Sequence, residues 1–147
     1  MEIAGGDPAE IGIRAGMANV NILAVAVAAL SSLLIGGVWF SPILFARAWQ
    51  REAGLTDDQL RKGAGKAMAS ALVLALIIAL NLGMFLGRHA GIAWGAGAGA
   101  LAGIGWATAS LATVYLFERR SLILIVIDGG YLAVSYAVMG AILGVWP

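Results

Sequence analysis

The sequence contains no cysteine and a single histidine, and only 12% of its 147 residues are charged. Without cysteine, the chain forms no disulfide and offers no thiolate nucleophile and no iron–sulfur ligand. One histidine, His89, cannot by itself complete a bis-histidine haem site or a structural zinc site. We therefore expect no metal or cofactor to be bound by this chain alone. His89 falls in a short loop, where a histidine is most often solvated, and contact with a pigment or haem of a partner stays open.

Residues that would form a catalytic centre are also scarce. The apolar segments hold no pair of acids, no histidine–aspartate set and no cluster of metal ligands. The net charge is +1 and no basic patch stands out, so we expect no nucleic-acid partner. The sequence predicts a protein that is not an enzyme.

Apolar residues, by contrast, are abundant. They make up 61% of the chain, and the mean hydropathy is +0.93. A spanning helix takes about 20 apolar residues, so this length accommodates four spans and one sizeable loop. We predict an all-α, integral membrane four-helix bundle that forms a single domain. Its predicted parts are a polar N-terminal arm (1–20), four spanning helices (about 21–45, 67–86, 92–117 and 122–146) and a cytoplasmic loop with a short helix (47–66).

Small residues recur at every fourth position in two of the predicted spans. The third span carries Gly91, Gly95, Gly99 and Gly103, and the second carries Ala71, Ala75, Ala79 and Gly83. In a bilayer, such small-xxx-small stripes let neighbouring helices approach closely. Because few residues join the two spans, they form an antiparallel hairpin, and we expect the two stripes to face each other.

Two local patterns predict where helices begin and end. Pro42 has no N–H to give to the carbonyl oxygen of Val38, so the first span should kink or end there. In the loop, Thr56 and Gln59 have the spacing of a capping box that opens a short helix.

The distribution of basic residues predicts the orientation. The loops that follow the first and third spans hold seven Lys and Arg residues, whereas the opposite side holds two. The positive-inside rule then places these loops in the cytoplasm and both termini on the periplasmic side of a bacterial inner membrane. The start of the chain, with Glu2, Asp7 and Glu10 against Arg14, is unlike a signal peptide. We therefore expect the first apolar run to remain as a spanning helix.

Asp128 is the one acid inside a predicted span, roughly 10 Å from the cytoplasmic end by helix rise. A charge near mid-bilayer costs about 2.5–3.5 kcal/mol on insertion scales, so this side chain should face the bundle interior. Polar residues expected at a similar depth are Trp39, Ser41, Ser70, Ser110 and Thr113. One interpretation is a proton or cation site. The other is a structural acid that accepts hydrogen bonds from the Trp39 indole and a hydroxyl, and we favour it because no second acid or base in the spans completes a relay.

Asn81 lies in the second span, nearer the outer side. We expect its amide to form a hydrogen bond between helices rather than to contact a substrate.

The segment from Asn21 to Gly54 contains a distinctive aromatic pattern. It reads Gly37-Val38-Trp39-Phe40-Ser41-Pro42, followed by Leu44-Phe45, Trp49 and Gly54. This pattern resembles the uncharacterised bacterial membrane family called domain-of-unknown-function family number 1761. Phe40 stands where the resemblance leads us to expect tyrosine, and Ala46 where it leads us to expect glycine. The resemblance implies a four-helix membrane protein and no particular function.

Two functions follow from these patterns. The favoured one is a non-enzymatic accessory or structural subunit, whose partners are the lipid bilayer and other membrane subunits or a second copy of itself. The alternative is a small homo-oligomeric proton-coupled transporter or channel that uses Asp128. A water-accessible crevice that reaches Asp128 would favour transport, whereas a dry, hydrogen-bonded Asp128 would favour the accessory role.

Overall fold

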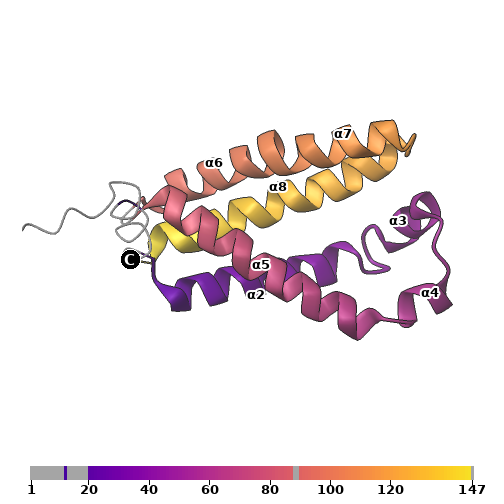
Figure 1. Ribbon diagram of the computed structural model, residues 1–147, viewed down its shortest axis with the longest axis horizontal. Coiled ribbons are helices and arrows are strands. Elements are labelled where there is room, and N and C mark those ends of the chain that lie inside the picture. Colours follow the sequence, from indigo (N-terminus) through magenta and orange to yellow (C-terminus); the bar gives the residue numbers. More distant parts are fainter. Residues whose placement is uncertain (1–11, 13–19, 88–89, 147) are drawn as a thin grey trace, which may run out of the picture.

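The computed structural model describes residue 12 and residues 20–87 and 90–146, and every regular element in them is helical (Figure 1). The first, second and fourth spans are α2 (Ile22–Trp39), α5 (Ala64–Leu86) and α8 (Leu122–Val145). The third is made of α6 (Ile92–Ala102), the π-helical segment η1 (Gly103–Thr108) and α7 (Ala109–Phe117). Two short helices, α3 (Ala46–Ala53) and α4 (Asp57–Arg61), lie between α2 and α5. His89 and the predicted arm, except for Gly12 and Val20, fall outside the described residues.

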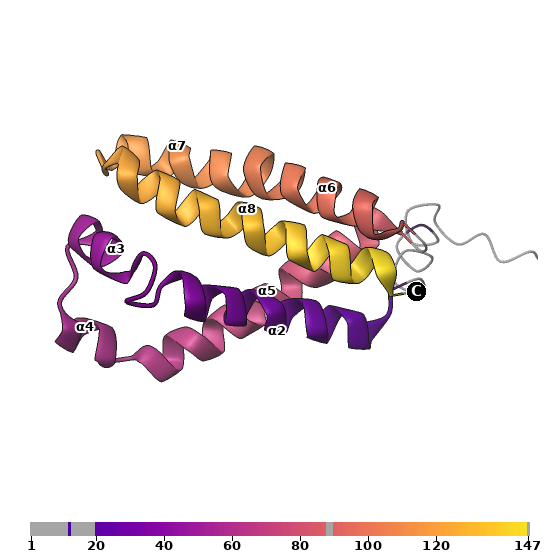
Figure 2. The same ribbon diagram turned by 180° about the vertical axis from the view of Figure 1, so that it is seen from behind.

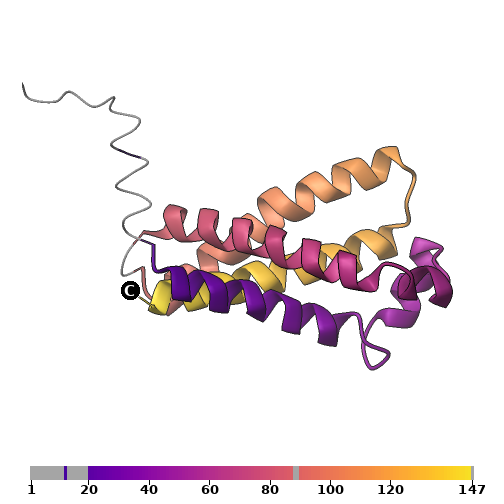
Figure 3. The same ribbon diagram turned by 60° about the horizontal axis from the view of Figure 1, so that its bottom comes forward.

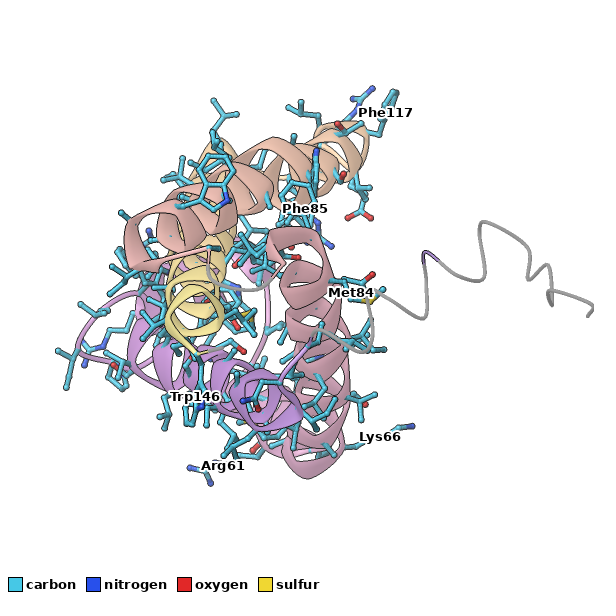
Figure 4. All side chains as sticks on the ribbon, turned by 90° about the vertical axis from the view of Figure 1, so that its left-hand side faces the viewer. Arg61, Lys66, Met84, Phe85, Phe117 and Trp146 are labelled. Atoms are coloured by element: carbon cyan, nitrogen blue, oxygen red, sulfur yellow. The ribbon has the colours of Figure 1, made fainter. Side chains whose placement is uncertain are left out.

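Four helices are long and apolar enough to cross a membrane: Ile22–Trp39, Ala64–Leu86, Ile92–Phe117 and Leu122–Val145. Large apolar side chains are exposed along all four of them. In Figure 4, which looks along the bundle, the labelled side chains of Phe117 and Lys66 point away from the other helices. An apolar exterior on long helices indicates a multi-pass membrane protein, because lipid replaces water around it.

The last span, α8, is the centre of the bundle. It contacts α6, η1, α2 and α5, whereas α5 and α6 barely touch each other. Figures 1 and 2 show the hairpin of α6–α7 and α8 on one side of the molecule and the pair α2 and α5 on the other. Figure 3 shows the α7 end of the third span splayed away from α2 and α5.

The predicted pairing of the second and third spans is wrong. Gly95, Gly99 and Gly103 face the backbone of α8, where a Cβ at Gly95 would overlap the carbonyl oxygen of Gly140. The reverse also holds, because a Cβ at Gly140 would overlap the carbonyl oxygen of Gly95. Gly91, which precedes α6, donates its N–H to the carbonyl oxygen of Gly144 over 2.9 Å. Glycine on both helices allows a closer approach than glycine against alanine, and this explains why α6 packs on α8.

The alanines of the second span pack on α2 instead. Ala75 and Ala79 are buried in one cluster with Ala24 and Ala28 of α2. Gly83 lies against Val20 and Leu143, while Ala71 is only half-buried. The main core of the protein is therefore an α2–α5–α8 core, and the third span attaches to it through α8.

The ends of the helices follow the local signals, with shifts of a few residues. The first span ends at Trp39 rather than at about Phe45, and Pro42 lies in the turn that follows. The second span begins at Ala64, earlier than expected. The predicted capping box is present, since the Thr56 side chain accepts from the Gln59 N–H and the Gln59 side chain accepts from the Thr56 N–H. The loop contains two short helices rather than one.

The π-helical segment η1 is a feature that the sequence pattern did not predict. It begins at Gly103, against α8, and ends at Thr108, whose hydroxyl donates to the carbonyl oxygen of Gly129 over 3.0 Å. A π turn takes one more residue than an α turn, so it rotates the residues that follow it around the helix. Its effect is to change which face of α7 meets α8.

The charged residues that the structure describes gather toward one end of the bundle. Helices α3 and α4 and the turn between α7 and α8 lie at the same end in Figure 1, opposite the C-terminus. Basic residues at this end are Arg47, Arg51, Arg61, Lys62, Lys66, Arg119 and Arg120. This basic end is the part of the molecule where the candidate site lies.

Candidate functional site

A cavity of about 500 Å³ lies at the basic end, between α3, α7, α8 and the turn after α2. Its polar lining comes from Asp128, Tyr115 and Arg120, and further lining comes from Phe40, Trp49, Tyr131 and aliphatic side chains. The Arg120 side chain is 44% exposed, so the cavity reaches the polar surface of the molecule. Asp128, the one acidic residue in the four candidate spans, lines this cavity.

Asp128 lies in the second turn of α8 and is half-buried. The Tyr115 hydroxyl, from α7, donates to Asp128 Oδ2 over 2.9 Å. The Trp49 side chain, from α3, lines the same cavity as this carboxylate. The Tyr115 hydroxyl therefore links α7 to α8, and as a donor it suits an ionised acid.

The rings of Phe40 and Tyr131 continue the wall from Trp49 toward α8. The rings of Phe40 and Trp49 meet edge to face with centroids 5.4 Å apart, and those of Phe40 and Tyr131 are tilted with centroids 5.3 Å apart. The Tyr131 hydroxyl donates to the carbonyl oxygen of Ser32 over 3.3 Å. Gly36 gives this ring room, since a Cβ there would lie 3.4 Å from it. The wall is held by α2 and α8 rather than by loops alone.

Trp39 does not bind Asp128, contrary to the prediction. Its indole N–H donates over 3.0 Å to the backbone carbonyl oxygen of Ile127, one residue earlier. The Trp39 ring packs against Gly130, and its centroid lies 4.9 Å from the centroid of the Phe45 ring. Trp39 thus fastens the end of α2 to α8 beside the cavity without lining it.

The predicted hydroxyl partners of Asp128 also lie elsewhere. The Ser41 and Thr113 hydroxyls donate to backbone oxygens of their own segments, those of Val38 and Ala109, over 2.7 and 2.9 Å. Ser110 is exposed on α7 and does not line the cavity. A hydroxyl does bind Asp128, but it belongs to Tyr115.

Asn81 is exposed, and its amide donates to the carbonyl oxygen of Ile77 on its own helix over 2.8 Å. It lines a second, apolar hollow of about 380 Å³ between α5 and the third span, together with Phe85 and Trp106. The prediction of a hydrogen bond between helices is therefore wrong, because the Asn81 amide binds a backbone oxygen within α5.

Helix α3 covers one side of the cavity and contacts the start of α8 outside the four candidate spans. Glu52 of α3 pairs with the hydroxyl of Ser121, the N-cap of α8, and this hydrogen bond, with a further contribution from Arg51, lowers the pKa of Glu52 below its ordinary value. The contact holds Trp49, three residues earlier, over the cavity.

Tyr115 is the site residue that sequence reasoning missed. The charged turn between α7 and α8 makes residue 115 face residue 124 in an antiparallel hairpin. Asp128 then lies one helical turn deeper, about 6 Å by helix rise. A tyrosine side chain is long enough to cover that distance. The register of the hairpin could therefore have identified Tyr115 as a partner of Asp128.

No group of three or more His, Cys, Asp and Glu side chains gathers in residues 20–87 and 90–146 in a way that could hold a metal ion. The chemistry available in the cavity is that of the Asp128 carboxylate, the phenols of Tyr115 and Tyr131, the Arg120 guanidinium and several aromatic rings.

These features define an all-α protein with four candidate membrane spans and an aromatic-walled cavity around a single acid. The chain belongs to the family described as proteins of unknown function DUF1761, whose model matches residues 23–144 and so confirms the resemblance. No curated protein and no solved structure matches the chain.

Proposed function

We propose that the protein is a small membrane carrier that binds its substrate in the cavity beside Asp128 and exchanges it for a proton. The observation that carries this proposal is the cavity of about 500 Å³, which reaches a carboxylate at membrane depth from the polar end. Small-molecule sites have volumes of about 300–1,000 Å³. An acid inside a span that lines such a space is typical of transport sites.

Proton exchange follows from the surroundings of the carboxylate. The Tyr115 hydroxyl donates to Asp128 when it is ionised, and Trp49 lines the same cavity. When the substrate leaves, a proton reaching the carboxylate through the cavity neutralises it, which reduces the cost of a charge at this depth. Binding of substrate and of a proton then exclude each other.

The carrier is proposed to lie in the bacterial inner membrane with its basic end in the cytoplasm and both termini on the periplasmic side. The support is the clustering of basic residues at the end that holds α3 and α4. The absence of native cysteine allows a direct test with Lys62→Cys and Ala90→Cys. In intact cells, an impermeant maleimide should label Ala90→Cys alone. Labelling of Lys62→Cys alone would reverse the orientation.

The carrier role can be tested in liposomes that contain the purified protein, a trapped pH dye and an imposed pH gradient. A panel of organic cations, zwitterions, anions and neutral solutes is added from outside. We expect at least one class to dissipate the gradient with the wild-type protein and with the matched variant Thr113→Val, whose hydroxyl lies outside the cavity. Asp128→Asn should abolish this response. An equal response from Asp128→Asn would refute the proposal.

A second candidate function is an accessory subunit or a self-associating bundle. The observation that favours it is the third span, which is the least buried of the four and exposes Trp94, Leu101, Ile104 and Trp106. The native mass of the protein, after gentle extraction from its own membranes, tests the accessory role. Co-extraction with larger subunits supports that role, whereas a defined homo-oligomer excludes it, and the liposome assay then separates the carrier from a self-associating bundle.

A further inference from the structure

We propose that the cavity takes an organic cation, a substituted ammonium group held between aromatic ring faces and the carboxylate of Asp128. The inference rests on the proposed function, because it concerns the same cavity, and it adds the chemical class of the substrate.

The walls of the cavity are rich in aromatic side chains. Phe40, Trp49, Tyr115 and Tyr131 all line the cavity. The rings of Phe40 and Trp49 lie at 61° to each other and those of Phe40 and Tyr131 at 58°. These rings therefore do not lie in one plane, and they contribute to the cavity wall at different inclinations. The negative ring faces attract ammonium groups, and several rings together form the cages that bind quaternary ammonium ligands.

The carboxylate of Asp128 lies where it can attract a cation strongly. Asp128 is half-buried at membrane depth, on the α8 side of the cavity, with apolar side chains such as Leu124 and Leu132 beside it. In surroundings of low polarity, a carboxylate attracts a cation much more strongly than it does in water. A cation is also the ligand that compensates the cost of keeping this acid ionised inside the bundle.

Arg120 also lines the cavity, and its positive charge would repel the cation that Asp128 attracts. Its guanidinium Nε lies 3.2 Å from Glu118 Oε2, and the two side chains are 44% and 50% exposed. The pair is neutral overall and is screened by water and salt. Asp128 lies about 10 Å deeper along α8 by helix rise. The field inside the cavity is therefore set by the carboxylate rather than by the guanidinium.

The test compares three probes of the same shape and different charge: choline, the neutral 3,3-dimethylbutan-1-ol and the anionic 3,3-dimethylbutanoate. Each is titrated into the full-length protein in lipid nanodiscs, and binding is measured by calorimetry. We expect choline to bind at least about tenfold more tightly than either isostere, which is the range that a cation–π cage and a carboxylate supply. Equal or tighter binding of the neutral or anionic probe overturns the inference, as does the absence of choline binding.

Two variants locate the binding site. Asp128→Asn and Trp49→Leu should each raise the Kd for choline about tenfold or more. Trp49 lies on α3, outside the spans, so its replacement leaves the four spanning helices unchanged. The matched control is Trp94→Leu, which removes an exposed tryptophan of α6 that does not line this cavity. Loss of choline binding in the control, or retention in both cavity variants, places the site elsewhere and overturns the inference.

The liposome panel keeps the two proposals separate. If a sugar or an anion dissipates the pH gradient in a manner that requires Asp128, the carrier role stands and the cationic substrate is wrong. If choline binds but no solute in the panel dissipates the gradient, the cationic site stands and the carrier role is wrong.

Discussion

Replacing Gly95 by alanine should separate α6 from α8. A Cβ at this position would overlap the carbonyl oxygen of Gly140 and would lie 2.9 Å from its carbonyl carbon and 3.1 Å from the Cα of Gly144. Carbon pairs prefer about 3.5–4.0 Å. Because the obstructing atoms are backbone, no rotamer change relieves the overlap, and the helices must move apart by roughly 0.5–1 Å.

The cost of this movement can be worked from the packing. A gap of about 0.5–1 Å forfeits a quarter to a half of each dispersion contact along the crossing. Overpacking of a close interface costs about 1–3 kcal/mol. A gain of up to about 1 kcal/mol from the higher helix propensity of alanine offsets part of this. We therefore expect Gly95→Ala to lower the free energy of unfolding by about 1–2 kcal/mol.

The matched control is Gly97→Ala, on the same helix. A Cβ at Gly97 would meet nothing within 4 Å, so this variant should be neutral or slightly stabilising. Both variants are unfolded with sodium dodecyl sulfate in mixed micelles, and helix content is followed by circular dichroism. If Gly95→Ala is as stable as Gly97→Ala, the close contact of α6 with α8 does not exist in the membrane, and the reasoning is refuted.

Three further predictions concern the site and its supports. A double-mutant cycle of Tyr115→Phe and Asp128→Ala should give a coupling free energy of about 0.6–1.7 kcal/mol in the same unfolding assay, and additive effects would exclude their hydrogen bond. Trp39→Phe should lower the free energy of unfolding by about 0.5–1.5 kcal/mol, because it removes an indole hydrogen bond to a backbone oxygen. The pKa of Glu52 is lowered in the folded protein, so its bond to Ser121 contributes stability above the ordinary value of 4.5 and is lost as the pH falls through the lowered pKa. Glu52→Gln should remove that part of the acid-side fall in Tm, measured over about pH 3–6. An unchanged acid-side profile would contradict the assignment.

Part of the candidate site was readable from the sequence. Asp128 stands out because it is the one acid in an otherwise apolar run, and desolvation makes such a residue conspicuous in any fold. Its partners were not readable. Trp39 was expected beside the carboxylate on grounds of depth alone, yet its indole donates to Ile127, one residue earlier. Depth along a helix fixes one coordinate of a side chain, whereas a hydrogen bond depends also on the rotation of both helices.

Properties that depend on local chemistry follow from the amino-acid sequence alone. Runs of apolar residues set the four spans, Pro42 ended the first helix because it lacks an N–H, and Thr56 with Gln59 began a short one. Each of these outcomes depends on residues within a few positions of one another.

The pairing of the helices, by contrast, depends on contacts between distant parts of the chain. Small residues line both α5 and α8, and the short connection after α5 suggested that α6 would pack on α5. Instead, α6 packs on α8, where Gly140 meets Gly95 without a side chain on either helix. The choice rests on a small difference in packing free energy between two similar surfaces. That same choice brings Tyr115 to Asp128 and so creates the cavity.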